Sequence, residues 1–572
     1  MAYNSRNRLK GLSIIIVLVS LACLIQLFLL QVVRGESFKD EADRQYIYSA
    51  KDDFSRGSIF FSDKDGKTTA AATLRPSFTL AINPQKIKDP EKVFGELSLI
   101  IDLDKTKFID QATKKNDTYE VIANDIDKTK ADTVSKAKIT GVSIYKQKKR
   151  FYPGGQVASH VIGFVGWGLT GGKQVFGGRY GLEKFYEDIL ARDSNRLYVN
   201  FFAQVFAGLS SLTQKENSIE ADVVLTIEPS VQTELENELR KVEEKWEPES
   251  TGGIVMDPNT GEIMAMAATP SFDPNSFNKV DNILNFNNPL VENVYEMGSI
   301  MKPLTMAAAL DANTITPDTT YVDNGNVKVG IATISNYDGR GRGKVNMQEV
   351  LNQSLNTGMV FVMQTMGVQK FTEYMKNYRL AEKSGIDLPN EVNNLVANLD
   401  SPREVEHATA AFGQGIAVTP IATIRALAAL GNGGYLVKPH VTKEVRYSEG
   451  IVDVTKFEKG KRILKAETSK KITEMLVTVV DKALVNGKAK MENYTIAAKT
   501  GTAQMSNPSG GYYDDRYMHT FFGYFPAYNP RFIIVLYSVN PKGAQYASVT
   551  MTEPFMNMAK FLLNYYQIPN DR

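Results

Sequence analysis

Cysteine, histidine and tryptophan are scarce in this chain of 572 residues. Its one cysteine, Cys23, excludes a disulfide bond within the chain. The four histidines lie far apart, without the spacing of metal ligands, and we expect neither a metal site nor a cofactor. The net charge is only +2, because basic and acidic residues are balanced, and this argues against a nucleic-acid partner.

Charged residues are absent from one stretch near the start, residues 11–33. About 20 apolar residues span a bilayer as a helix, so we predict a single transmembrane anchor here. The basic residues that precede it place residues 1–10 in the cytoplasm and the bulk of the chain outside, in the plasma or inner membrane. The alternative is a cleaved signal peptide, whose apolar region is usually shorter, at roughly 7–15 residues.

The length exceeds that of one ordinary domain, and 43% apolar residues are enough for a sizeable core. Residues 34–220 predict a domain of mixed strands and helices without a catalytic constellation. It should contain a hairpin turn at Asp65-Gly66, small surface helices over 89–138 and an amphipathic helix over 181–190. His160 is expected to have a structural role here.

Residues 221–572 have a different pattern. A buried strand is predicted at 223–227, a helix at 229–244 and a β-hairpin over 253–267. Further helices are predicted at 303–312, 346–352, 357–366, 419–431, 468–486 and 553–566, and strands at 495–504, 520–525 and 532–539. Strands at both ends with helices between them predict an α+β domain, in which the hairpin and the last three strands share one sheet.

Within this domain, Ser299 and Lys302 begin an apolar stretch that continues to Leu310. We predict a helix that starts at Ser299, with Pro303 in its first turn. Residues three apart are neighbours on a helix, so the Lys302 amine would lie beside the Ser299 hydroxyl. A lysine can take the proton of a serine only if burial lowers the lysine pKa, and the apolar flanks supply that burial.

The order of motifs is a stronger signal than this spacing, which recurs without a following apolar helix at Ser135, Ser143 and Ser276. Ser354-Leu355-Asn356 comes later, and Lys499-Thr500-Gly501-Thr502 comes near the end of the chain. Three such motifs in this order are typical of class A β-lactamases and penicillin-binding proteins. Taken singly, the second is also compatible with a helix N-cap and the third with a polar hairpin strand.

With these residues in place, the chain resembles a class B penicillin-binding protein, the membrane-anchored peptidoglycan D,D-transpeptidase of bacterial division or elongation. The resemblance also rests on shorter matches, which include Arg56-Gly57, Arg150-x-Tyr152-Pro153, Gly181-Leu182-Glu183 and Phe412-Gly413-Gln414-Gly415. Members usually have Pro-Gly-Ser-Thr-Phe-Lys at the nucleophile, where this chain has Met-Gly-Ser-Ile-Met-Lys. The resemblance implies a pedestal of the dimerisation type over 34–220. It also implies a penicillin-recognising, serine β-lactamase-like transpeptidase domain over 221–572, with a central antiparallel sheet flanked by helices.

The resemblance also implies a reaction, the cross-linking of stem peptides through a serine ester. Ser299 would attack the carbonyl between two terminal D-alanines, and Lys302 would accept its proton. Ser354 would return a proton to the leaving amine, since a hydroxyl both donates and accepts. Asn356 would hold Lys302 and the peptide amide through its carboxamide.

The third motif would bind the donor peptide. Lys499 and the hydroxyls of Thr500 and Thr502 would bind its terminal carboxylate. Gly501 would let the peptide approach the strand closely, as an added strand. The backbone N–H groups of Ser299 and Thr502 would form the oxyanion hole.

The expected partners are stem peptides, β-lactams, the membrane, a polytopic glycan polymerase and other division or elongation proteins. Two other functions stay open: a D,D-carboxypeptidase or β-lactamase-type hydrolase, and a penicillin-binding scaffold or sensor without turnover. A class A β-lactamase needs a second base, and no Glu-x-x-Leu-Asn occurs between Ser354 and Lys499. Septal or lateral wall synthesis and the acceptor amine also stay open.

Overall fold

The computed structural model describes residues 18–21, 26, 55–170, 172–192, 220–448, 450–457 and 460–572. These residues form two compact units, one built on 74–149 and the other on 56–73, 150–192 and 220–572. The predicted anchor, 11–33, lies outside the described residues except for 18–21 and 26. Within the described ranges, no helix combines the length and the apolar character that a membrane crossing needs.

Over residues 74–149, the smaller unit consists of three strands and three short helices with capped N-termini. Its strands are the second part of β3 (Thr68–Ile82), β4 (Glu120–Ile126) and β5 (Val142–Phe151), and β3 pairs with both others. The predicted surface helices are α3 (Pro90–Ser98), α4 (Lys105–Ala112) and α5 (Lys128–Ala137). Each begins after an aspartate whose carboxylate accepts a backbone N–H of the first turn, which satisfies one free donor of the helix end.

The larger unit contains a five-stranded antiparallel sheet in the order β11-β10-β20-β19-β18. The strands are β10 (Ser250–Met256), β11 (Ile263–Thr269), β18 (Ala497–Ser506), β19 (Tyr512–Phe525) and β20 (Phe532–Val539). The prediction that the first hairpin and the last three strands share one sheet is therefore confirmed. The strand with the Lys499 motif, β18, lies at the edge.

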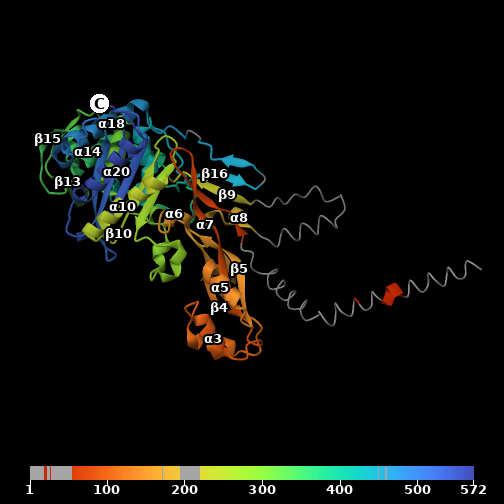
Figure 1. The fold of residues 1–572 in the computed structure, drawn as a ribbon. Helices are drawn as coiled ribbons and strands as arrows, with labels where there is room; N and C mark the ends of the chain where they lie inside the picture. Colours follow the sequence, from red (N-terminus) through yellow and green to blue (C-terminus); the bar gives the residue numbers. More distant parts are fainter. Residues whose placement is uncertain are drawn as a thin grey trace, which may run out of the picture. The chain divides into compact units, whose positions relative to one another are not determined.

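Helices cover both faces of this sheet, so its central strand β20 is buried from end to end. Ile534 and Leu536 contact the cluster under α10 (Pro229–Trp246) and α20 (Thr552–Tyr565), which pack together over one face (Figure 1). Ile533 and Val535 belong to the main core on the other face. Successive side chains of β20 thus point to opposite faces of the sheet, as they do along any strand.

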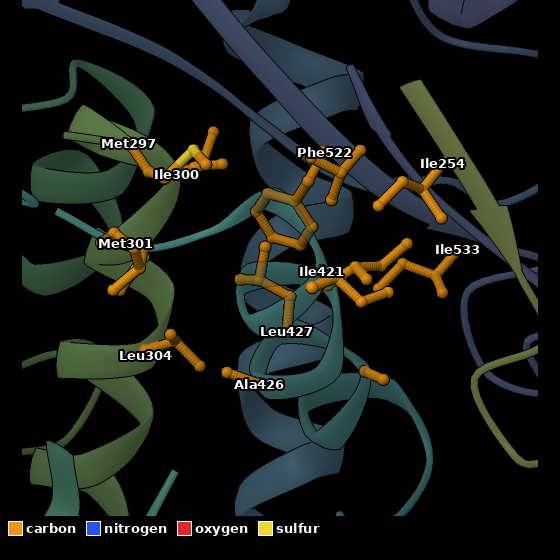
Figure 2. Close-up of a cluster of buried hydrophobic side chains, with 14 of the residues drawn as sticks. Ile254, Met297, Ile300, Met301, Leu304, Ile421, Ala426, Leu427, Phe522 and Ile533 are labelled. Atoms are coloured by element: carbon orange, nitrogen blue, oxygen red, sulfur yellow. The ribbon is translucent and has the colours of Figure 1, made fainter. Parts of the chain in front are cut away.

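The other face carries the helix that follows Ser299, α12 (Lys302–Asp311), together with α17 (Pro420–Gly431). Figure 2 shows Leu304 directed toward Ala426 of α17, and Phe522 of the sheet above Leu427 of the same helix. Both helices are buried almost all round, as expected for helices inside a large domain.

The remaining helices include α13 (Met347–Asn352), α14 (Asn356–Met366), α15 (Val368–Asn377), α16 (Glu404–Ala410) and α18 (Ala466–Thr478). We did not predict α15, although its buried Phe371 and Met375 have helical spacing, nor did we predict α16. The helix predicted over 468–486 ends early. It continues as a π-turn and a 3-10 turn, in which Val485 and Asn486 have φ of 50° and 56°, outside the right-handed helical region.

A second sheet of the larger unit contains β17 (Val452–Val454), β16 (Thr442–Tyr447), β9 (Ala221–Leu225), β2 (Ile59–Ser62) and the start of β3. The predicted strand at 223–227 is thus real, and β2 and β16 are its partners. The hairpin turn at Asp65-Gly66 joins β2 to β3, as predicted. The single helix predicted over 181–190 is wrong: α7 (Gly181–Phe185) and α8 (Glu187–Leu190) are separated at Tyr186.

Candidate active site

Ser299 lies on a 3-10 turn, Gly298–Met301, and the α-helix proper begins at Lys302. The predicted start at Ser299 is therefore early by about one turn, while Pro303 is in the first turn of α12 as expected. The residues that replace the usual family sequence here, Met297, Ile300 and Met301, are all buried in the core (Figure 2). The altered turn is thus fully packed.

This nucleophile turn, Met297–Met301, is held by close backbone contacts. The Gly298 N–H donates to the Gly413 carbonyl at 3.0 Å, and Gly298 has a φ of 59° that favours glycine. A Cβ on Gly501 of β18 would lie 2.9 Å from the Met297 carbonyl oxygen and 3.0 Å from the Ile300 nitrogen. We expected Gly501 to make room for a substrate peptide. In the structure the nucleophile turn itself occupies that room.

Lys302 is fully buried and its amine lies among oxygen atoms. Its Nζ is 2.6 Å from the Ser354 carbonyl oxygen, 2.8 Å from Asn356 Oδ1 and 3.2 Å from Ser354 Oγ. No carboxylate of the described chain pairs with it. Burial, and next the charge of Lys499, hold its pKa well below the ordinary value for lysine. A neutral amine with a free electron pair can act as a base.

Ser354 lies between α13 and α14 with a φ of 56°. Its hydroxyl contacts both buried lysines, at 3.2 Å from Lys302 Nζ and 3.0 Å from Lys499 Nζ. The alternative that Ser354 is a helix N-cap is wrong, because the N-cap of α14 is Leu355 and has no side-chain hydrogen bond. The amide nitrogen of Asn356 donates to the Ser335 carbonyl, which fixes its oxygen toward Lys302.

Lys499 lies on β18 with only 3% of its surface exposed. Besides Ser354, its amine contacts the carbonyl oxygen of Thr500 at 3.0 Å. Burial lowers the pKa of Lys499 to about 7. Near neutral pH this amine therefore exchanges between its charged and neutral forms.

A cleft of about 750 Å³ opens over these groups. Most of the predicted site residues line it: Ser299, Ser354, Asn356, Lys499, Thr500 and Thr502. Thr502 Oγ1 accepts the Ala547 N–H at 3.0 Å, which leaves its own proton available to a ligand. Lys302 is buried beneath the cleft and Gly501 is packed against the nucleophile turn, so neither is on the lining.

Several residues of the site escaped the sequence analysis. Asn336, Tyr337, Gln504 and Tyr546 line the cleft, and no local pattern marks them because they come from loops and strands far apart in sequence. Glu296 could have been singled out from the sequence, because it directly precedes the nucleophile turn. Its Oε1 accepts the Gly415 N–H at 2.8 Å and the Tyr512 hydroxyl at 3.1 Å.

Comparison with known families agrees with this geometry. A family model described as penicillin-binding protein transpeptidase domain matches residues 251–559, more than half of the chain. A second model, the penicillin-binding protein dimerisation domain, matches residues 52–200. The chain belongs to the class B penicillin-binding proteins. The three motifs that meet in its cleft are thus the motifs that carried the resemblance.

This penicillin-binding protein has relatives along nearly its whole length. It is 30% identical to stage V sporulation protein D of Bacillus subtilis over 96% of this chain and 84% of the relative. It is 27% identical to a probable peptidoglycan D,D-transpeptidase, PenA, of Neisseria gonorrhoeae, over 96% and 90%. Its fold is similar to that of penicillin-binding protein 2X of Streptococcus thermophilus, with a TM-score of 0.73 at 21% identity over 90% and 79%.

Proposed function

We propose that Ser299 is the nucleophile and Lys302 the general base of this penicillin-binding protein. The chain is a serine-type acyl-transfer enzyme of its family, a peptidoglycan D,D-transpeptidase of cell-wall synthesis. The observation that carries the residue assignment is the buried Lys302 amine, which has three oxygen neighbours, no carboxylate partner and a lowered pKa. Burial favours the neutral form of such an amine, and the neutral form can accept a proton.

In the first half of the reaction, Ser299 Oγ bonds to the carbonyl carbon between the two terminal D-alanines of a stem peptide. The Ser299 proton passes to Lys302, and the peptide C–N bond breaks as the tetrahedral intermediate collapses. Ser354 Oγ contacts both lysines and can hand a proton to the departing D-alanine amine, then recover one from Lys302. The product is an ester on Ser299.

The donor peptide is placed along the free edge of β18 as an added strand. Lys499, Thr500 and Thr502 line this edge of the cleft and bind the terminal carboxylate. The backbone N–H groups of Ser299 and Thr502 form the oxyanion hole. The contact of Gly501 with the nucleophile turn supports this pairing, because it keeps the two segments in register.

In the second half an acceptor amine from another stem peptide attacks the ester carbonyl carbon. The C–O bond to Ser299 breaks, and the amine gives up a proton to Lys302, which returns one to Ser299 Oγ.

No described residue that lines the cleft is an aspartate, a glutamate or a histidine. A class A β-lactamase activates water with a glutamate, so this lining favours transfer to an amine over the β-lactamase alternative. A carboxypeptidase could use Lys302 itself as the base, and the labelling test below separates it from a transpeptidase. Without a dedicated base for water, the ester that Ser299 forms with a β-lactam is hydrolysed slowly, so the β-lactam stays covalently bound. The nucleophile Ser299, the base Lys302 and the proton relay Ser354 are all present, which argues against a scaffold without turnover.

We also propose the topology that the sequence predicts. Residues 1–10 are cytoplasmic, 11–33 form a single-pass anchor, 34–220 a pedestal and 221–572 the transpeptidase domain outside the cytoplasm. The charge-free run after a basic N-terminus supports this. Expected partners are a polytopic glycan polymerase and other division or elongation proteins.

The test is covalent labelling of the full chain in neutral detergent with a fluorescent penicillin, followed by peptide mass analysis. We expect the label on Ser299, persisting for many minutes, and no label on Ser299→Ala. Rapid loss of label would favour a hydrolase, and a folded but unlabelled protein would favour the scaffold. Label on another residue would contradict the proposal.

A further inference from the structure

A second cavity lies in the larger unit and shares no residue with the catalytic cleft. Its volume is about 620 Å³. It lies beside the buried helix α17, where the loop after α15 meets the chain that follows α17. Neither the three motifs nor the proposed reaction uses it.

The lining of this cavity is strongly basic. Six of its described residues are cations at neutral pH: Arg379, Lys383, Arg425, Lys438, Lys456 and Lys461. Asp387 is the one acidic residue among the described lining residues, and it accepts the N–H groups of Val441 and Thr442, each at 2.8 Å. Because the whole chain has a net charge of only +2, composition alone does not explain this cluster.

Few carboxylates of the described chain neutralise the cations that line this cavity. Arg379 pairs with Glu382 at 2.9 Å, but none of the four lysines has an ion pair within the described part of the chain. Like charges that surround a concave surface repel one another and create a positive potential in it. An anion in the cavity would relieve that repulsion.

Arg425 of α17 adds a buried charge, since only 5% of its surface is exposed. Its guanidinium donates to three backbone carbonyls, those of Lys383 at 2.8 Å, Arg379 at 2.6 Å and Glu382 at 3.0 Å. Its Nε is buried and has no hydrogen-bond partner in the described structure. The nearby Glu391 carboxylate instead accepts the N–H of Gly385 at 3.1 Å. The guanidinium charge therefore has no direct anionic partner.

We propose that this cavity binds a phosphate group carried by a larger molecule. A phosphate offers several acceptor oxygens and up to two negative charges, which suits a cavity lined by four lysines and two arginines. The volume exceeds the size of a single phosphate and leaves room for the groups attached to it. The phosphate could belong to a lipid headgroup or to a water-soluble phosphate ester, because both present the same oxygens.

The test is isothermal titration of pyrophosphate into the full chain in neutral detergent. We expect saturable binding with a Kd below about 1 mM, weakening as salt screens the charges. The double variant Lys438→Gln/Lys461→Gln should bind at least about tenfold more weakly, since hydrogen bonds to charged groups are lost. The matched control is Lys490→Gln/Lys560→Gln, two exposed lysines outside both cavities, and it should bind like the wild type.

A competition arm separates the two sources of phosphate. Displacement of pyrophosphate by micellar phosphatidylglycerol would assign the site to a lipid headgroup, and binding without displacement would assign it to a soluble ester. Both double variants should keep penicillin labelling at Ser299, which shows that they are folded. Equal pyrophosphate affinity in the two double variants, or no binding of either probe, would overturn the proposal.

Discussion

At the scale of single residues, the site depends on two buried amines that share one hydroxyl. Lys302 Nζ and Lys499 Nζ both contact Ser354 Oγ, at 3.2 and 3.0 Å. Burial lowers the pKa of both amines, and the positive charge of Lys499 lowers the pKa of Lys302 further. The shift favours the neutral, basic form of Lys302, while Lys499 changes its charge near pH 7.

We predict a pH dependence that comes from Lys499. Its pKa of about 7 means that the amine is charged below this pH and attracts a carboxylate, and is neutral above it. The second-order rate constant of acylation by benzylpenicillin should therefore fall between pH 7 and 9, approaching about tenfold per pH unit. Stopped-flow measurement of penicillin binding checks this.

The control is Lys499→Arg, since a guanidinium keeps its charge throughout this range. The variant can be slower overall, because the two cations differ in shape. Its rate constant should nevertheless not fall between pH 7 and 9. A flat wild-type profile, or the same fall in the variant, would show that Lys499 does not supply the charge that binds the carboxylate.

At the scale of elements, the nucleophile turn is clamped between β18 and the loop that carries Gly413. The Thr520 hydroxyl of β19 donates to the Met297 carbonyl at 2.9 Å, and the Gly413 carbonyl accepts the Gly298 N–H. Small side chains at these contacts let three backbones meet. The position of Ser299 relative to the edge strand therefore depends on glycines that have no chemical role.

We predict that Gly501→Ala impairs catalysis more than stability. The added Cβ would lie 2.2 Å from Thr520 Oγ1 and against the backbone of the nucleophile turn, so one segment must shift. Acylation by benzylpenicillin should slow by about 10²- to 10³-fold, as when an oxyanion donor is lost. The free energy of unfolding should fall by only about 1–3 kcal/mol.

Gly95→Ala in α3 is the matched control, because nothing lies within 4 Å of the added Cβ. It should leave acylation unchanged and stabilise the helix by up to about 1 kcal/mol. Stopped-flow kinetics and urea unfolding measure both effects. Wild-type acylation in Gly501→Ala would mean that the turn is not positioned by β18.

At the scale of the whole molecule, a buried ion cluster joins three distant segments of the larger unit. Glu183 of α7 pairs with Arg56 at 2.5 Å and with Arg150 at 2.6 Å, and all three side chains are buried. Arg150 also donates to the Gly57 carbonyl at 2.7 Å. Removal of the central carboxylate would leave Arg150 without a counter-charge, while Arg56 would keep only its pair with the half-buried Glu187, at 2.7 Å.

We predict that Glu183→Gln lowers the free energy of unfolding by about 3–5 kcal/mol. Burial alone would raise the pKa of Glu183, but Arg150 and Arg56 lower it overall. A carboxyl with a lowered folded-state pKa stabilises at neutral pH, and this is lost as the pH falls through that value. Glu183→Gln should lack this part of the acid denaturation of the wild type.

Urea unfolding at pH 7 and at decreasing pH measures both effects. Asp400→Asn is the control, because its pair with Lys376 is exposed and should contribute less than about 1 kcal/mol. A loss in Glu183→Gln as small as in this control would show that the cluster is not required for the unit to hold together.

The sequence by itself determined the features that depend on neighbouring residues. The helices at 229–244 and 419–431 correspond to α10 and α17, each with proline in its first turn, and the strand at 532–539 corresponds to β20. Capping, proline geometry and apolar periodicity act within a few residues, so they can be read along the chain. Each of the three motifs is likewise a run of a few residues, and their order along the chain indicated the family.

Tertiary structure decided what those motifs contact. Ser354 has helix-capping chemistry but no capping role, because packing directs it toward two lysines that are distant in sequence. Gly501 accommodates the protein's own nucleophile turn, and the strand β9 pairs outside the catalytic sheet. The tertiary structure also decided the lowered pKa values of Lys302 and Lys499. Burial is a property of the assembled core, and no single segment contains it.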